Sequence, residues 1–381
     1  MGIRTRVGRL AAIATIGIAS VGVAACGSDD TSTSGGGEEQ QKGTGKLDGG
    51  GKQLVYFSLS SSNSYIAEHN KQAKAEAAKL GYKMKIFENN FDQAQQDQQV
   101  SQFLASGQKP AAILWWPNNS QAGINATRQL SRIAPVVQTN QLLLPEGRKY
   151  VKFYVGVNDK LIGTDSAKNL IQAREEDRKA GKKLNSKEGN LLIFRFAEGY
   201  LAGDDRTNAF LAETKSDPFN VLLTEPMPTP DAQSGYKAAS ALIPKYKSQG
   251  IDYVFSNNNN SLVGIARALK ENGLTPGKDV QLSGGDCSGN MEPFKKGEIY
   301  GSVLQPPGVE GKLLARTTAA HLATGKVTPG TFTYDQSVDT EPEATMEPPH
   351  QYTFMPAGQM IGGDALSKPA IWGLTADEAC F

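Results

Sequence analysis

Short apolar runs alternate with segments of helical periodicity over most of the chain. The first run is Leu54–Phe57, and in the segment that follows, Tyr65–Leu80, alanine and aliphatic residues recur at helical spacing up to Gly81. Nearly continuous apolar strands that alternate with helices are typical of parallel sheets covered on both faces. The pattern therefore predicts an α/β fold.

The alternation falls into two series of similar rhythm. The first series has strands at 54–57, 82–87, 111–115, 135–138 and 151–157, with helices at 65–80, 93–106 and 120–132. The second has strands at 190–194, 220–224, 253–256, 280–283 and 300–304, with helices at 160–178, 204–214, 232–246, 261–272, 291–296 and 309–323. Two series of this kind predict two doubly wound parallel-sheet lobes.

The amino-terminal end has the order of an export signal. Three arginines, at positions 4, 6 and 9, precede an apolar run over 10–25, which is short for a membrane span of about 20 residues. Val23-Ala24-Ala25-Cys26 resembles the lipobox of bacterial lipoproteins, which implies that Cys26 is lipidated and becomes the first mature residue. An alternative is an ordinary signal cut at an Ala-x-Ala site, with Cys26 incidental. The lipobox reading predicts an extracytoplasmic protein anchored to the cell membrane.

Composition divides the rest of the chain. Residues 26–51 are almost free of apolar side chains and predict a flexible tether. We expect residues 52–157 with 306–328 to form an amino-terminal lobe, and residues 158–305 with 329–345 to form a carboxyl-terminal lobe. Residues 346–381 are rich in proline and glycine, and we expect an irregular extension there.

Charge and cysteine usage narrow the set of partners. The formal charge is +1, and removal of the three signal arginines leaves the mature part near −2, so nothing indicates a nucleic-acid partner. We expect a monomer. Cys287 and Cys380 remain after Cys26 is lipidated. In an oxidising compartment they form either a disulfide or two separate buried thiols, and the sequence does not decide between these.

Signatures of enzymes are scarce. The three histidines, His69, His321 and His350, have no cysteine or carboxylate at metal-ligand spacing. His69 and His321 fall on predicted helices, and we expect them at the surface. The chain has no Gly-x-Ser-x-Gly elbow and no complete phosphate loop. We therefore expect no catalytic residue, no cofactor and no metal site.

Polar and aromatic residues instead follow the carboxyl ends of the predicted strands, which is the edge where open α/β sheets bind ligands. They include Asn63, Tyr65, Trp116, Asn140, Phe196, Tyr200, Arg206, Asn258, Asp286 and Gln305. The pattern predicts a ligand site rather than a catalytic centre.

These residues also carry a family resemblance. From about Gln53 to Lys326 the chain resembles the ribose-binding-protein group of type I periplasmic binding proteins, the sugar receptors of ABC importers. The matches are Asn63-Ser64-Tyr65-Ile66, Arg206-Thr207-Asn208-Ala209-Phe210, Asn258-Asn259, Gly284-Gly285-Asp286 and Gln305, and the family's Asp-Arg aligns with Asn140-Gln141. The resemblance implies two lobes joined by three crossings, near 157–159, 257–260 and 305–308, that close like a hinge on a ligand.

The residue types fit a sugar, which has an apolar face and a rim of hydroxyl groups. Tyr65 and Trp116 are the candidates for stacking on the face. The candidates for binding hydroxyl groups are Asn140, Arg206, Asn258, Asp286 and Gln305, and Asn63 begins the first ligand loop.

Each assignment has a structural alternative. The two aromatic residues would then belong to the core, Arg206 would pair with Asp204 or Asp205 at the surface, Asn258 and Asp286 would be cap or turn residues, and Asn140 and Gln305 would hold loops.

Amides replace charges at several family positions, so we expect a neutral monosaccharide or polyol rather than ribose. The partner would be an ABC permease. An alternative is a ligand-sensing receptor that delivers the closed state to a membrane signalling protein, and the sequence does not separate the two.

Overall fold

The computed structural model describes residues 47–325, 343–347, 350–355, 357–371 and 373–380, and for residues 343–354 only the backbone. The predicted signal peptide, Cys26 and most of the predicted tether lie outside these residues. Among the helices in the described part of the chain, none combines the length and the apolar character needed to cross a membrane.

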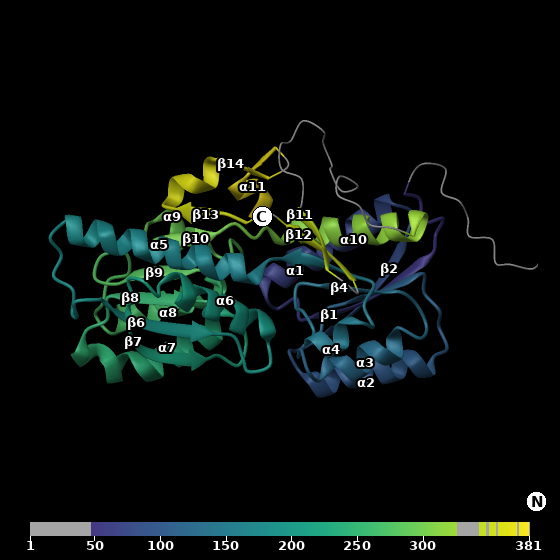
Figure 1. The fold of residues 1–381 in the computed structure, drawn as a ribbon, viewed down its shortest axis with the longest axis horizontal. Helices are drawn as coiled ribbons and strands as arrows, with labels where there is room; N and C mark the ends of the chain where they lie inside the picture. Colours follow the sequence, from purple (N-terminus) through teal and green to yellow (C-terminus); the bar gives the residue numbers. More distant parts are fainter. Residues whose placement is uncertain (1–46, 326–342, 348–349, 356, 372, 381) are drawn as a thin grey trace, which may run out of the picture. The chain divides into compact units, whose positions relative to one another are not determined.

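The first half of the chain alternates strands and helices as predicted (Figure 1). Its elements are β1 (Gln53–Leu59), α1 (Ser64–Lys79), β2 (Lys83–Asn89), α2 (Gln93–Ala105), β3 (Ala112–Trp115), α3 (Gly123–Leu130), β4 (Val136–Thr139), α4 (Pro145–Arg148) and β5 (Phe153–Val157).

A second alternation follows. Its elements are α5 (Asp159–Lys179), β6 (Asn190–Arg195), α6 (Leu201–Glu213), β7 (Asn220–Pro226), α7 (Ala232–Tyr246), the 3-10 turn η1 (Lys247–Gln249), β8 (Tyr253–Ser256), α8 (Asn259–Glu271), β9 (Gln281–Gly284), α9 (Glu292–Lys295) and β10 (Gly301–Val303).

The chain ends with a long helix and a set of short elements. These are α10 (Pro307–Thr324), β11 (Glu343–Glu347), β12 (His350–Met355), β13 (Gln359–Ile361), η2 (Gly363–Ser367), β14 (Pro369–Ile371), β15 (Leu374–Thr375) and α11 (Ala376–Cys380).

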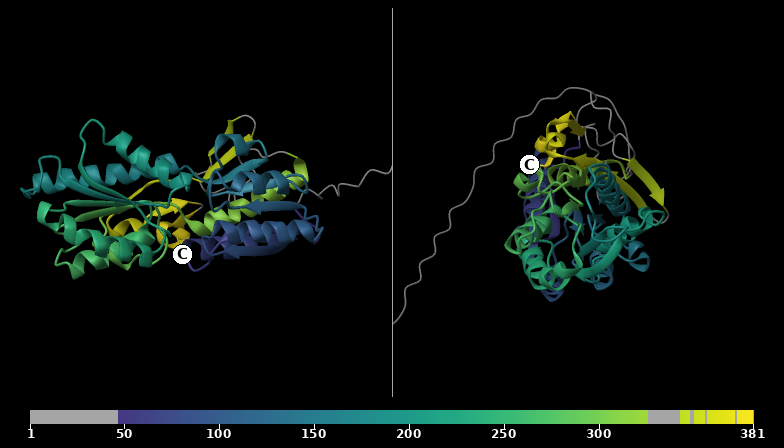
Figure 2. Two further views of the ribbon diagram at one scale, coloured as in Figure 1. Left: turned by 90° about the horizontal axis from the view of Figure 1, so that it is seen from below. Right: turned by 90° about the vertical axis from the view of Figure 1, so that its left-hand side faces the viewer.

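The strands form two main sheets, which confirms the predicted two-lobed α/β fold. The first has the order β11-β12-β5-β4-β3-β1-β2 and the second the order β13-β10-β9-β8-β6-β7. Strands β1 to β5 pair in parallel, as do β6 to β10. Helices lie on both sides of each sheet (Figure 2).

Alternating residues of each central strand supply two separate cores. In β1, Leu54 and Tyr56 pack with α1 and α10, whereas Val55 and Phe57 pack with α2 and α3. In the second lobe, β6 divides in the same way, with α7 and α8 on one face and α5 and α6 on the other. This burial on both faces explains the nearly continuous apolar runs in the sequence.

Glycine allows close backbone contact in two helix pairs, α1 with α10 and α5 with α6. A Cβ at Gly311 of α10 would lie 2.3 Å from the carbonyl oxygen of His69 in α1. A Cβ at Gly163 of α5 would lie 2.1 Å from the carbonyl oxygen of Arg206 in α6. Each pair therefore packs with its backbones closer than any other residue permits.

The chain passes between the two sheets at three places, but one differs from the prediction. It crosses between β5 and α5, between β10 and α10, and between Met355 of β12 and Gln359 of β13. The predicted crossing at 257–260 is wrong, because β8 and β9 are neighbours in one sheet and α8 packs in the same lobe.

The tail, which is the described part of the chain from residue 343 to residue 380, is more regular than expected. β12 pairs in parallel with β5, β11 pairs with β12, and β13 pairs antiparallel with β10. The tail thus adds two strands to the first sheet and one to the second. The prediction of an irregular extension over 346–381 is therefore wrong, and residues 343–345, expected in the second lobe, belong to the sheet of the first. Short edge strands owe their form to pairing with a neighbour, which a proline- and glycine-rich sequence does not reveal.

Candidate ligand-binding site

All eight residues selected for ligand binding line one cavity between the two lobes. The lining residues are Leu59, Asn63, Tyr65, Ile66, Phe91, Trp116, Asn140, Phe196, Tyr200, Arg206, Pro230, Asn258, Asp286 and Gln305. The cavity measures about 40 Å³, whereas pockets for small molecules usually enclose about 300 Å³ or more. The cavity is therefore much smaller than a typical small-molecule pocket.

Asn63 and Asn258 occupy equivalent positions at the starts of α1 and α8. The side-chain oxygen of Asn63 accepts a hydrogen bond from the N–H of Tyr65 at 2.9 Å, and that of Asn258 accepts from the N–H of Ser261 at 3.1 Å. Both amides then donate to the carbonyl oxygen of Pro230, at 2.7 and 2.9 Å. The two residues are therefore helix caps that also join the lobes through one carbonyl group.

Arg206 is 2 % exposed, and all three of its nitrogens have partners. Nε donates to Oδ1 of Asp159 at 2.7 Å, Nη1 to the carbonyl oxygen of Asn257 at 2.8 Å, and Nη2 to Oε1 of Gln305 at 3.0 Å. The alternative of a surface ion pair with a neighbouring aspartate is wrong, because the guanidinium pairs with Asp159 inside the protein.

A chain of hydrogen bonds continues from Arg206 into the first lobe. Nε2 of Gln305 donates to the hydroxyl of Tyr65 at 3.1 Å, and this hydroxyl donates to Oε2 of Glu310 at 2.5 Å. The amide of Asn140 donates to both oxygens of Glu310, at 3.2 and 3.1 Å. Because arginine only donates, Gln305 accepts from Arg206 through its oxygen and donates to Tyr65 through its amide. The Tyr65 hydroxyl is then the donor to Glu310 whenever that carboxyl group is ionised.

Asp286 combines a turn role with a place in the cavity wall. Its Oδ1 accepts from the N–H of Asn259 at 3.0 Å and more distantly from the N–H of Ser288 at 3.4 Å, and the Ser288 side chain also donates to the carboxylate. The side chain lines the cavity. A carboxylate with two oxygens has further acceptor positions, so Asp286 is a candidate to accept from a ligand hydroxyl.

Aromatic rings form the apolar part of the wall. Trp116 donates its indole N–H to the hydroxyl of Tyr200 at 2.8 Å, and its ring meets that of Tyr65 edge-on at 6.4 Å. Phe196 contacts Tyr200 edge-on at 5.4 Å, and the Arg206 guanidinium lies 5.4 Å from the Phe196 ring. Tyr65 and Trp116 also belong to the core of the first lobe, which is their structural alternative, and their stacking on a sugar stays a prediction.

The backbone is strained at two positions of the cavity wall. Asn140 has a φ of 57° and Phe91 a φ of 58°. Asparagine tolerates the left-handed region, whereas a bulky side chain rarely adopts it. Strain of this kind collects at ligand sites, and Phe91, which the sequence analysis missed, lines the cavity.

The site contains three buried carboxyl groups and one buried guanidinium, that of Arg206. Burial raises the pKa of Glu310 to about 7, and it raises the pKa of Asp286 and of Asp159 to about 6 despite the nearby Arg206 charge. Glu310 and Asp159 were not selected from the sequence. A charged residue in the first turn of a predicted helix is usually solvated, and only the fold turns these two inward.

His69 corrects a further expectation. It was expected at the surface, but it is fully buried, and burial lowers its pKa to about 3. Its Nδ1 lies 3.3 Å from the hydroxyl of Tyr56 and its ring packs edge-on against Trp116 at 5.2 Å. The reason is the α1–α10 contact, which covers the helix face that carries His69. His321 is partly buried against Phe153, and the side chain of His350 lies outside the description.

The sequence matches a known protein family and a characterised relative. Residues 55–326 match the family model described as a periplasmic binding protein domain. The galactofuranose-binding protein YtfQ of Escherichia coli (strain K12) is 25% identical over 270 residues, which cover 67% of this chain and 78% of that protein.

Solved structures show the same fold. A protein from Mycobacterium smegmatis in complex with β-D-fucofuranose has a TM-score of 0.66 at 17% identity, over 81% of this chain and 91% of that chain. A solute-binding protein of an ABC transporter from Bacillus halodurans C-125, with bound myo-inositol, has a TM-score of 0.64 at 19% identity, over 82% and 95%.

The family match spans most of the chain and includes both lobes and all eight selected residues. The family is one of binding proteins and not of enzymes. The chain thus belongs to the periplasmic binding protein family and has the type I, ribose-binding-protein-like fold.

Proposed function

We propose that the protein is the solute-binding component of an ABC importer and binds a neutral monosaccharide or polyol between its lobes. The observation that carries this proposal is the cavity itself, where aromatic rings, amides, an arginine and an aspartate from both lobes converge. Rings suit the apolar face of a sugar, and planar polar groups suit its hydroxyl rim. The relatives named above include a galactofuranose-binding protein and two proteins whose structures contain bound β-D-fucofuranose or myo-inositol.

Binding would proceed by opening and closing about the three crossings. The cavity of about 40 Å³ is too small for a sugar ring, so the lobes separate to admit the ligand and close around it. A ligand that touches both lobes only in the closed state shifts the population toward that state. The permease would then recognise the closed form.

The sequence alone supports the proposed lipid anchor at Cys26. The basic head, the apolar run and Val23-Ala24-Ala25-Cys26 support lipidation of Cys26 on the outer face of the membrane, with residues 26–51 as the tether. The body would function as a monomer. Its lobes would comprise residues 52–157 with 306–328, and residues 158–305, with the tail shared between them as the sheets indicate.

A thermal-shift screen tests the ligand class. The purified chain without its signal is heated with a panel of neutral monosaccharides and polyols and with charged sugars as the comparison. Ligand at about 100 times its dissociation constant stabilises the folded state by about 2.7 kcal/mol. We expect at least one neutral compound to raise the melting temperature, and stabilisation by charged sugars alone would contradict the proposal.

A further inference from the structure

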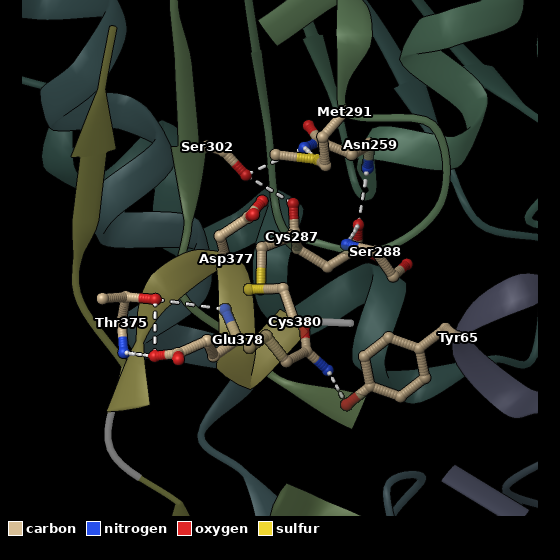
Figure 3. Close-up of a disulfide and its surroundings, with 12 residues drawn as sticks. Tyr65, Asn259, Cys287, Ser288, Met291, Ser302, Thr375, Asp377, Glu378 and Cys380 are labelled. Atoms are coloured by element: carbon tan, nitrogen blue, oxygen red, sulfur yellow. Dashed lines mark hydrogen bonds between the residues drawn. A yellow bond between two sulfur atoms is a disulfide. The ribbon is translucent and has the colours of Figure 1, made fainter. Parts of the chain in front are cut away.

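The carboxyl-terminal segment contains a disulfide that adjoins the candidate site. Cys380 in α11 is bonded to Cys287, with 5.6 Å between their Cα atoms (Figure 3). Cys287 directly follows Asp286 in the sequence. The segment lies beyond residues 55–326, the part that the family model matches. The disulfide therefore joins a segment outside the family domain to Cys287, the residue next to Asp286 of the cavity wall.

Helix α11 lies where the two lobes meet. Ala379 packs in the core of the first lobe, whereas Ala376 and Cys380 pack in the core of the second. Cys380 also lines a hollow of about 710 Å³ together with Ser64 of α1 and Asn260 of α8, whose side chains are hydrogen-bonded across the lobes at 3.2 Å. The tail thus contacts both sides of the interlobe boundary.

The loop that carries Asp286 is flanked by glycine and is held both by its own lobe and by the tail. Within the lobe, the Arg206 guanidinium donates to the carbonyl oxygen of Gly285, and the Asn260 amide donates to the Ser288 hydroxyl. Gly284 and Gly285 precede Asp286, and Gly289 follows with a φ of +80°, so glycine flanks the loop on both sides. The carbonyl oxygen of Asp286 accepts from the hydroxyl of Ser302 in β10, and Ser302 is paired with Met360 of β13 in the tail. The tail consequently reaches this loop twice, by strand pairing and by the disulfide.

We propose that the tail is a clamp that, through the Cys287–Cys380 bond, holds the Asp286 carboxylate in its ligand-facing position. In this view Cys287 and Cys380 are positioning residues, since neither contacts the ligand. The inference builds on the proposed function, because it concerns the same cavity. Its consequence is that loss of the bond loosens Asp286 and weakens ligand binding by removing preorganisation.

Two backbone amides report on the clamp without any ligand. The N–H groups of Asn259 and Ser288 both donate to Oδ1 of Asp286, whereas the N–H of Ser261 donates to Asn258 in the same helix start. Amide hydrogen exchange, resolved by NMR, is compared between wild type and Cys380→Ser. We expect exchange at Asn259 and Ser288 to rise about tenfold, with Ser261 unchanged.

A second route avoids the folding of a variant. The folded wild type is reduced with TCEP, both thiols are blocked with iodoacetamide, and the same amides are measured. Lys295→Ala is the matched control, because it removes the 3.3 Å ion pair between Lys295 and Asp377 of the tail and leaves the disulfide intact. We expect this variant to exchange like wild type.

Isothermal titration calorimetry with myo-inositol, D-allose and D-arabinose measures the ligand affinity of the wild type and of the protein without the disulfide. For any of the three that binds wild type, we expect about tenfold weaker binding without the disulfide. If none of the three binds wild type, the exchange result alone decides on the clamp, and the thermal-shift panel decides on the ligand class. Equal exchange at Asn259 and Ser288 with and without the disulfide would overturn the inference.

Discussion

Glu310 offers a test of the electrostatics at the site, through the variant Glu310→Gln. The carboxyl group is fully buried and accepts hydrogen bonds from Tyr65 and Asn140. The nearest titratable cation candidate is His69, 4.0 Å away, and it is neutral because burial lowers its pKa to about 3. Asp159 raises the pKa of Glu310 and Arg206 lowers it, but burial dominates and brings the value to about 7.

The sign of the effect follows from linkage. The pKa of Glu310 rises from an ordinary 4.5 to about 7 in the folded state, so its favourable contribution is complete below pH 4.5 and is lost as pH rises through about 7. At about 1.4 kcal/mol for each pH unit of difference, the loss amounts to about 3 kcal/mol of unfolding free energy. A glutamine at this position does not ionise, so the variant escapes this loss.

Urea unfolding followed by tryptophan fluorescence at pH 5, 6, 7 and 8 measures the difference between variant and wild type. We expect this difference to shift in favour of Glu310→Gln by about 2.5 kcal/mol from pH 5 to pH 8, since part of the loss occurs below pH 5. Asp159 and Asp286 titrate in both proteins, so their own contributions cancel apart from the coupling between Asp159 and Glu310. Glu213→Gln, which removes the same charge from an exposed helix position, is the control. A difference that is constant across this pH range would refute the reasoning.

Two further predictions concern the packing around the site. Arg206→Ala should lower the unfolding free energy by about 3–5 kcal/mol, because it leaves Asp159 buried without its partner, and Arg206→Ala with Asp159→Asn should recover part of the loss in urea titrations. Gly311→Ala should cost about 1–3 kcal/mol, since its methyl group would lie 2.3 Å from the backbone of α1. Gly358→Ala, with open space around the new methyl group, is the comparison, and equal melting temperatures for these two glycine variants would argue against the close contact of α1 and α10.

The regular helices and strands of the two lobes could be predicted from the sequence. Helix α7 and strand β8 have the predicted bounds, 232–246 and 253–256, because strands buried on both faces and amphipathic helices leave a clear apolar pattern. The tail has no such apolar pattern, because its strands form by pairing with the edge strands β5 and β10 of the two sheets. The crossing between Met355 and Gln359 was missed for the same reason.

The site was predicted for residues at strand ends and missed for residues on helix faces. Asp286 and Gln305 follow strands, and parallel strands bring their carboxyl ends to one edge. Glu310 and His69 lie within helices, where the sequence gives no direction for a single polar side chain. One signal was available: Asn140 stands where the family has an aspartate, so a compensating carboxylate was worth seeking near the last crossing, and Glu310 is five residues after Gln305.

Titration calorimetry of the wild type and of Asp286→Asn tests the central claim most directly. The amide keeps an Oδ1 acceptor for the backbone groups that Asp286 binds, but it removes the negative charge and replaces the second acceptor oxygen by an NH2 donor. We predict that a neutral monosaccharide or polyol binds the wild type once per chain with micromolar affinity, about −8 kcal/mol, and that the variant binds it at least about tenfold more weakly. Equal affinity in the two proteins would contradict a ligand site between the lobes.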